Sequence, residues 1–199
     1  MSELPNVVPS TTHVLTADEA PRRCDPAVWA SALSLDDYIA QATELQPLWE
    51  STRRIAQIDE ATREAAAKLD GPLSLLVLTE DWCGDAIHTL PFVQRLVEAN
   101  PRLTMRLLKR DAHDAVMDAH RSAGARSIPV VIVYDADGRE CGWWGPRPSV
   151  LQAWVKRDAA EMDVKERWRA IRTWYARDRG VSCAREVLLL LQHADQVSA

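Results

Sequence analysis

The residues best suited to chemistry lie around Cys83. Residues 78–86 read Leu-Thr-Glu-Asp-Trp-Cys-Gly-Asp-Ala, and Ser127-Ile128-Pro129 follows later in the chain. A cysteine thiolate can attack a disulfide, and a second cysteine three positions along resolves the mixed disulfide that forms. Here Ala86 occupies that second position. The chain therefore keeps a sulfur nucleophile and lacks the adjacent group that would complete the exchange.

A helix predicted to begin at Cys83 places the thiol between opposing electrostatic effects. Unpaired backbone N–H groups and the positive end of the helix dipole favour the thiolate, whose pKa can fall to between ~3.5 and ~7.5. The carboxylates of Glu80, Asp81 and Asp85 lie close in sequence and favour the neutral thiol. The sequence leaves both outcomes open, so Cys83 is either a working nucleophile or an inert remnant on a binding scaffold.

Arg126 is the candidate counter-charge for Cys83, because it precedes the Pro129 loop that we expect to pack opposite the sulfur. His88 is a poorer candidate, since five residues along a helix turn it about 140° away from Cys83. Trp82, directly before the cysteine, offers an incoming peptide or small thiol a flat apolar surface.

The four cysteines, at positions 24, 83, 141 and 183, are far apart and show no zinc-site spacing. We expect no metal and no cofactor. Cys141 and Cys183 are interpreted as packed residues. Cys24 lies in a predicted irregular arm, which makes it a candidate for a distant resolving thiol.

Composition predicts an ordinary globular protein. The chain has 199 residues, 47% of them hydrophobic and 27% charged, with a formal net charge of -5. This charge gives no electrostatic case for nucleic acid or an anionic membrane. Residues 1–26 contain no apolar run flanked by basic residues, so neither a signal peptide nor a membrane span is predicted there, and a cytoplasmic location is the default expectation.

The N-terminal third is predicted to flank the core. Residues 1–34 contain four prolines and no periodicity, which predicts an irregular arm with a helical turn near Trp29. Residues 35–69 show apolar residues at helical intervals, and Pro47 suits the first turn of the second of two helices. Asp70-Gly71-Pro72 then ends this helical extension.

Helix and strand patterns alternate over residues 70–160. The apolar run 73–78 predicts a strand buried on both faces. It is followed by a helix at 83–99, a strand at 103–108, a helix at 113–123, strands at 130–134 and 139–144, and a closing helix at 148–160. The Ala-Asp-Gly turn predicts an antiparallel hairpin at the end of an otherwise parallel sheet. Residues 161–199 carry two apolar stripes, which predict two helices packed on the core.

This βαβαββα order, with Trp-Cys-Gly at a strand-to-helix junction and Ile-Pro opening a hairpin, resembles the thioredoxin fold over residues 70–160. The segments 79–85, 126–129 and 144–148 are similar to a bacterial thioredoxin-like family that commonly carries Cys-Gly-Asp-Cys or Cys-Gly-Asp-Ala and has extra helices at both ends. The resemblance implies an α/β mixed sheet and thiol transfer, with Cys83 as nucleophile and Pro129 in a cis peptide facing it. Trp82, Gly84, Asp85, Ile128 and Pro129 would form the docking groove.

Two departures limit the implied activity. Ala86 replaces the resolving cysteine, and Val77 stands where thioredoxins place a buried aspartate that assists resolution. The preferred hypothesis is a monothiol protein that exchanges with a protein disulfide or a low-molecular-weight thiol. The alternatives are a non-catalytic peptide-binding module and, less favoured, cluster binding of the kind known in monothiol glutaredoxins. The sequence does not distinguish a monomer from a homodimer.

Overall fold

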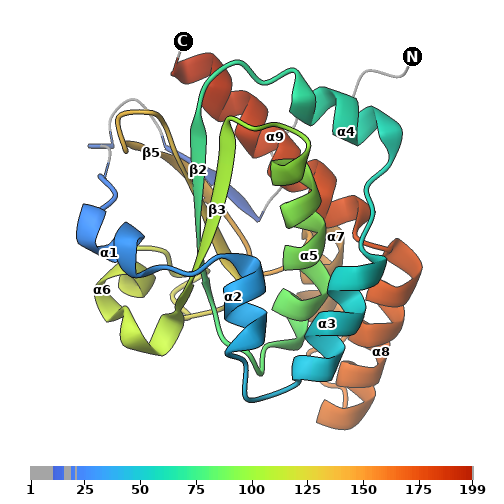
Figure 1. Ribbon diagram of the computed structural model, residues 1–199. Helices are drawn as coiled ribbons and strands as arrows, with labels where there is room; N and C mark the ends of the chain where they lie inside the picture. The colour runs from blue at the N-terminus through green and yellow to red at the C-terminus, as the bar shows by residue number, and fades with distance from the viewer. Residues whose placement is uncertain (1–10, 16–18, 21, 199) are drawn as a thin grey trace.

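A mixed five-stranded sheet forms the centre of the computed structural model, which describes residues 11–15, 19–20 and 22–198 (Figure 1). Its strands are β1 (Thr12–Val14), β2 (Leu73–Thr79), β3 (Leu103–Lys109), β4 (Val130–Tyr134) and β5 (Glu140–Trp144), in the order β1-β5-β4-β2-β3. β2 and β3 are parallel, whereas the other three neighbouring pairs are antiparallel. The predicted α/β class with a mixed sheet is therefore confirmed.

The helices, in chain order, are α1 (Pro26–Ser31), α2 (Leu35–Ala40), α3 (Gln46–Ile55), α4 (Glu60–Ala67), α5 (Gly84–Glu98), α6 (Asp114–Asp118), α7 (Ser149–Arg157), α8 (Val164–Asp178) and α9 (Val181–Val197). A short 3₁₀ helix (Arg110–Ala112) precedes α6. Helices α5 and α9 lie side by side on one face of the sheet, and α1 and α6 lie on the opposite side (Figure 1). Pro47 occupies the first turn of α3, as expected from the sequence.

Continuous apolar sequences explain why β2 and β4 occupy the middle of the sheet. β4 has every residue buried, and β2 has all but one buried, as strands covered on both faces require. The hydrophobic core extends from these strands to α5 and α9. The end of β2 and the start of α5 therefore rest on a rigid support, and this junction carries Cys83.

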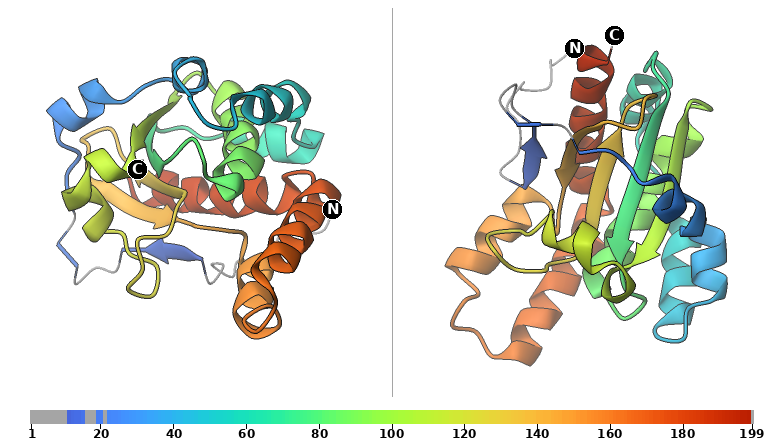
Figure 2. Two further views of the ribbon diagram at one scale, coloured as in Figure 1. Left: turned by 90° about the horizontal axis from the view of Figure 1, so that it is seen from below. Right: turned by 90° about the vertical axis from the view of Figure 1, so that its left-hand side faces the viewer.

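The helix that covers the sheet is α9, and this differs from the predicted closing role of residues 148–160. α9 contacts β5, β4, β2 and β1, as well as α5. α7 instead forms a small separate cluster with α8, made of Leu151, Ile171 and Tyr175 with partly buried neighbours. α7 and α8 thus form an arm that projects from the body of the molecule (Figure 2).

Described parts of the N-terminal arm pack against the sheet. Residues 1–10, 16–18 and 21 of the predicted irregular arm lie outside the described residues. β1 pairs with β5 and extends the sheet, which the sequence pattern did not predict. α1 contains Trp29, where a helical turn was expected.

A buried ionic group ties this arm to the β4–β5 hairpin. Glu140 has a fully buried side chain and accepts hydrogen bonds from Arg22, at 2.6 Å, and His120, at 3.1 Å. Burial raises the pKa of Glu140, but the hydrogen bonds from His120 and Arg22 outweigh that effect and hold the pKa below its usual value. The carboxylate form is therefore the form that stabilises the fold.

Acid is expected to remove this stabilisation. Because the folded-state pKa of Glu140 lies below its ordinary value of 4.5, its contribution is complete above that pH and is lost as the pH falls through the folded-state pKa. Urea unfolding of the wild type and Glu140→Gln across acid pH measures this effect, and the variant should show the smaller pH dependence. Glu64→Gln, at an exposed position, is the control and should keep the wild-type dependence. Equal pH dependence in wild type and Glu140→Gln would contradict the prediction.

Candidate functional site

Cys83 lies at the junction of β2 and α5. The chain leaves β2 at Thr79, turns, and enters α5 at Gly84, so that Cys83 is the N-cap residue. Its side chain is only 6% exposed, and the Sγ thiol donates a hydrogen bond to the carbonyl oxygen of Ile128 at 3.6 Å. The two motifs separated in sequence therefore meet at the sulfur.

Two cis peptide bonds lie in neighbouring loops: Ile128–Pro129, which precedes β4 and faces Cys83, and Gly145–Pro146, which follows β5. Gly145 has a φ of 140°, and a Cβ at this position would lie 2.1 Å from the carbonyl oxygen of Pro129. Only a glycine allows this close approach of two backbone segments. Pro129 is itself buried, and Gly145 brings the loop after β5 against its carbonyl group.

A buried ion pair lies beside the sulfur. Asp85, which is 3% exposed, accepts a hydrogen bond from the hydroxyl of Tyr175 at 2.9 Å and pairs with Nη2 of Arg147 at 2.6 Å. Tyr175 comes from α8, and Arg147 precedes α7, so this cluster holds the α7–α8 arm to the start of α5. His88 stacks on Tyr175 at 5.1 Å between ring centroids, and burial lowers its pKa.

The environment of Cys83 favours the neutral thiol. Burial raises the pKa of Cys83 to about 12, and the negative charge of Asp85 acts in the same direction. The backbone N–H groups of Ala86 and Asp85 and the charge of Arg147 oppose the shift without overcoming it. The sequence left open whether the helix terminus or the carboxylates would set the pKa of Cys83. Burial of the thiol is the largest effect and decides the direction of the shift.

Glu80 and Asp81, the other nearby acids, are engaged in anchoring neighbouring segments. Glu80 accepts a hydrogen bond from the backbone N–H of Asp111. The carboxylate of Asp81 accepts hydrogen bonds from the backbone N–H groups of Thr43 and Glu44. These acids fix the loops around the junction.

Two tryptophans border the site at the surface. Trp82 is 44% exposed, and the guanidinium of Arg110 lies 5.2 Å from its ring centroid. Trp168, on α8, is 43% exposed, and a Cβ added at Gly84 would lie 4.0 Å from its ring. The arm therefore reaches over the first turn of α5 and covers the sulfur from that side.

The expected site residues thus fall into two groups. Cys83, Asp85, Ile128 and Pro129 come together but are buried, whereas Trp82 remains open to solvent. The predicted counter-charge at Arg126 is engaged elsewhere, since its guanidinium pairs with Asp114 and Asp118, both at 2.7 Å.

Arg147 is the cation that acts on the sulfur instead of Arg126. Sequence analysis missed Tyr175 as part of the site. The sequence signal that could have indicated it is the position of Tyr175 on an apolar helical stripe, which predicts that this side chain packs on another surface.

Cys24 lies far from this centre. Its backbone N–H bonds the carbonyl oxygen of Gly138, in the turn at the far end of β4 from Pro129. Five strand residues rise about 17 Å. Cys24 therefore cannot reach Cys83 in this arrangement, and all four cysteines are free thiols.

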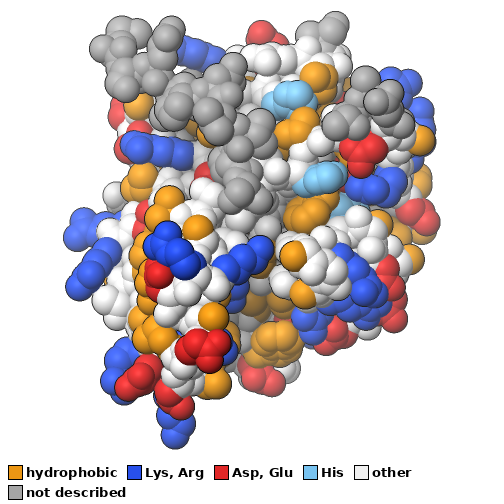
Figure 3. Space-filling view, turned by 180° about the vertical axis from the view of Figure 1, so that it is seen from behind, with side chains coloured by type: hydrophobic (Ala, Val, Ile, Leu, Met, Phe, Trp, Pro, Cys, Tyr) orange, Lys and Arg blue, Asp and Glu red, His pale blue; other side chains and the backbone are white. Residues whose placement is uncertain are grey.

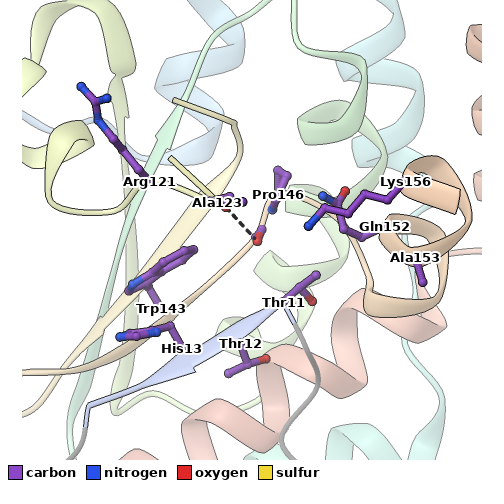
Figure 4. A pocket seen from close by; sticks show the side chains of 12 residues that line it. Thr11, Thr12, His13, Arg121, Ala123, Trp143, Pro146, Gln152, Ala153 and Lys156 are labelled. Atoms are coloured by element: carbon purple, nitrogen blue, oxygen red, sulfur yellow. Dashed lines mark hydrogen bonds between the residues drawn. The ribbon is translucent and has the colours of Figure 1, made fainter. Parts of the chain in front are cut away.

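A cavity of about 420 Å³ lies on the other side of Pro146, between β1, β5 and α7 (Figure 4). His13 and Trp143 stack on its wall at 5.5 Å between centroids, and Lys156 extends from α7 toward Pro146. Its lining does not include Cys83 but shares Gly145 with the backbone contact at Pro129. The cavity and the Cys83 site are therefore neighbours that share this contact.

Neither a metal centre nor a membrane span emerges from the described residues. Among them, no group of three His, Cys, Asp or Glu side chains is placed to hold a metal ion. None of the helices described combines the length and apolar character that crossing a bilayer requires.

Comparisons with known proteins agree with this geometry. A family model described as Thioredoxin matches residues 32–165. A solved protein of unknown function from Pseudomonas aeruginosa is similar at 16% identity and a TM-score of 0.66, covering 86% of this chain and 99% of its own. An HIV epitope-scaffold is similar at 15% identity and a TM-score of 0.66, covering 85% and 98%. At these identities the two structures support the fold alone, and no curated protein matches the chain.

Proposed function

The chain belongs to the thioredoxin family, and we propose that it is a non-catalytic protein-binding module in which Cys83 remains a thiol. One observation carries this proposal: the sulfur is buried, donates a hydrogen bond to Ile128, and has a pKa raised to about 12. At pH 7 such a group is almost entirely protonated, and only the thiolate attacks a disulfide. Exchange through Cys83 is then too rare to sustain turnover.

The residues around the sulfur support the same proposal. Ala86 is fully buried where a resolving cysteine would stand, and Val77 is fully buried where the assisting acid would stand. The α7–α8 arm covers the first turn of α5 and is fastened there by Tyr175 and Asp85. A disulfide substrate has no open approach to the sulfur while the arm is in place.

Alkylation with iodoacetamide tests this proposal. At pH 7.5 we expect Cys83 to react at least about a hundredfold more slowly in the folded protein than in urea, because the lower thiolate fraction outweighs the greater nucleophilicity of a high-pKa thiolate. Mass mapping should show the rate at Cys83 still rising at pH 10, without a plateau. The more exposed Cys24 provides the internal control. A plateau below pH 8.5 at Cys83 would refute the proposal.

Monothiol exchange is the second candidate function, and the position of Cys83 favours it. The sulfur lies at the start of α5, where the N–H groups of Asp85 and Ala86 lower its pKa, and it faces the cis peptide at Pro129. If the arm opens, the thiolate would attack one sulfur of a disulfide, form a mixed disulfide and release the other sulfur as a thiolate. A stable adduct at Cys83 after incubation with a small aromatic disulfide supports exchange. Unchanged partner binding by Cys83→Ser supports the module.

A further inference from the structure

The α7–α8 arm carries an open groove of about 750 Å³ on the side away from Cys83. α7 lines it with Val150, Ala153, Trp154 and Arg157, which follow helical spacing along one face. α8 lines it with a second stripe, Glu166, Arg169, Ala170, Trp174 and Arg177. Two parallel stripes with this spacing form the kind of seat into which a third helix packs.

The floor of the groove is apolar and exposed. Val150 is 66% exposed, and Trp154 and Trp174 are partly buried against the small cluster of Leu151 and Ile171. The side chains of the two tryptophans thus have a packed base and an open edge. Tryptophan held in this way is a common anchor of binding energy in protein interfaces.

The rim of the groove is basic, although the chain as a whole is acidic. Three arginines and one glutamate line it, in a chain with a net charge of -5. Within the described part of the chain, Arg169 and Arg177 form no ion pair, whereas Arg157 pairs with Asp158 at 2.7 Å. In the lower left of Figure 3, apolar side chains lie between charged ones on this side of the molecule. Free guanidinium groups beside tryptophans favour carboxylates with apolar neighbours.

We propose that this groove binds an acidic amphipathic helix of a partner protein. The α8 stripe from Glu166 to Arg177 spans about 16 Å, which matches three turns of a helix. Apolar residues of the partner at i, i+3, i+4 and i+7 would rest on the tryptophans, and its flanking carboxylates would meet Arg169 and Arg177.

The same charges disfavour a second copy of this chain as the occupant. A two-fold contact would bring together two grooves that each carry three arginines and one glutamate, and this excess of like charge repels. The groove is lined by ten residues, fewer than the roughly 20–30 residues a side of a standard interface, which indicates weak, reversible binding. The inference deepens the proposed binding function, on which it rests, by naming the surface and the chemical class of the partner.

A designed helical peptide provides the test. The probe is a fluorescein-labelled peptide of about fourteen residues with leucine at i, i+3, i+4 and i+7 and glutamate on both flanks. Fluorescence anisotropy at 0.15 M salt should give a dissociation constant in the micromolar range for the wild type. Arg169→Glu with Arg177→Glu should weaken binding at least tenfold, and Val150→Asp, at an exposed floor position, should abolish it.

Two controls separate the groove from the charge of the whole helix. Lys165→Glu with Arg172→Glu changes the same number of charges on α8 outside the groove, and this variant should keep the affinity within about threefold because salt screens distant charges. A peptide with lysine in place of glutamate should reverse the order and prefer Arg169→Glu with Arg177→Glu.

Several results would overturn the inference. The first two are equal affinity of the wild type for the glutamate and lysine peptides, and peptide binding that Val150→Asp leaves unchanged. The other two are a wild-type dimer that Val150→Asp dissociates, and wild-type protein that sediments with phosphatidylglycerol vesicles but does not bind the peptide. Slow alkylation of Cys83 together with failed peptide binding rejects the groove and leaves the non-catalytic proposal standing. Fast alkylation with peptide binding intact rejects the non-catalytic proposal and retains the groove.

Discussion

Replacing Arg147 with leucine is expected to lower the free energy of unfolding by about 3–5 kcal/mol. The guanidinium is the only cation paired with Asp85 among the described residues, and the carboxylate side chain is 4% exposed. Without Arg147 the negative charge stays buried, with the hydroxyl of Tyr175 as its main remaining side-chain partner. Urea unfolding followed by circular dichroism measures the loss.

The partner substitution decides whether the loss comes from the unpaired charge. Asp85→Leu combined with Arg147→Leu removes both charges, and apolar replacement of a whole buried pair is often close to neutral. The double variant should therefore be more stable than Arg147→Leu alone. Arg126→Leu is the matched control, because its exposed ion pairs should contribute little to stability. Equal destabilisation by Arg147→Leu and Arg126→Leu would contradict the argument.

Substitutions at Arg147 and Asp85 act on Cys83 in opposite directions. Arg147 lowers the pKa of the thiol and Asp85 raises it. Arg147→Leu should therefore slow alkylation of Cys83, whereas Asp85→Asn should accelerate it. The ion pair therefore couples the stability of the fold to the reactivity of Cys83.

The sequence predicted β2, β3, β4 and β5 because these strands carry local signals. It missed β1, and the expectation of an otherwise parallel sheet was wrong, since β2 and β3 form the one parallel pair among the described strands. The apolar runs that became β2 and β4 are long enough to be buried on both faces, and the Asp135–Gly138 turn defines the β4–β5 hairpin. The paired motifs at Cys83 and Pro129 also came together as expected. The strands and the hairpin turn depend on residues close in sequence, and the meeting of the two motifs depends on one loop contact.

The position of the last helices could not be predicted in the same way. The apolar stripes of α7 and α9 both predict that the helix packs on an apolar surface. Neither stripe indicates which of the two helices packs on the sheet. α9 is the longer and more apolar helix, and it fills the space beside α5. α7 is left to pack on α8, which creates both the cover over Cys83 and the groove on its outer side.

The choice of counter-charge was a matter of distance, which sequence does not supply. Arg126 is next to the loop in the chain, but its side chain is held by acids of α6. Arg147 lies farther along and reaches Asp85 because β5 ends beside the start of β4. The burial of the Cys83 site likewise depends on the position of α8. No local sequence pattern specifies how α8 packs.

Replacing Glu186 with alanine is expected to destabilise the protein by about 4 kcal/mol, because it removes the acceptor shared by several buried donors. The carboxylate of Glu186, on α9, accepts hydrogen bonds from the indole N–H of Trp144 at 2.8 Å and the hydroxyl of Thr11 at 3.1 Å. It also accepts them from the backbone N–H of Ser149 at 2.9 Å and its hydroxyl at 2.6 Å. Trp144 is fully buried, so its N–H has no access to water when the carboxylate is lost.

This single side chain therefore fastens α9 to β5, to the start of α7 and to the residue before β1. Glu186→Gln keeps one acceptor oxygen and should lose only part of the stability, and the denaturant slope should stay unchanged if the compactness of the folded state is preserved. Glu64→Ala, at an exposed position, should change the free energy of unfolding by less than about 0.5 kcal/mol. A loss at Glu186→Ala no larger than that of Glu64→Ala would show that water or rearranged partners satisfy the donors, and that α9 is held by its apolar contacts alone.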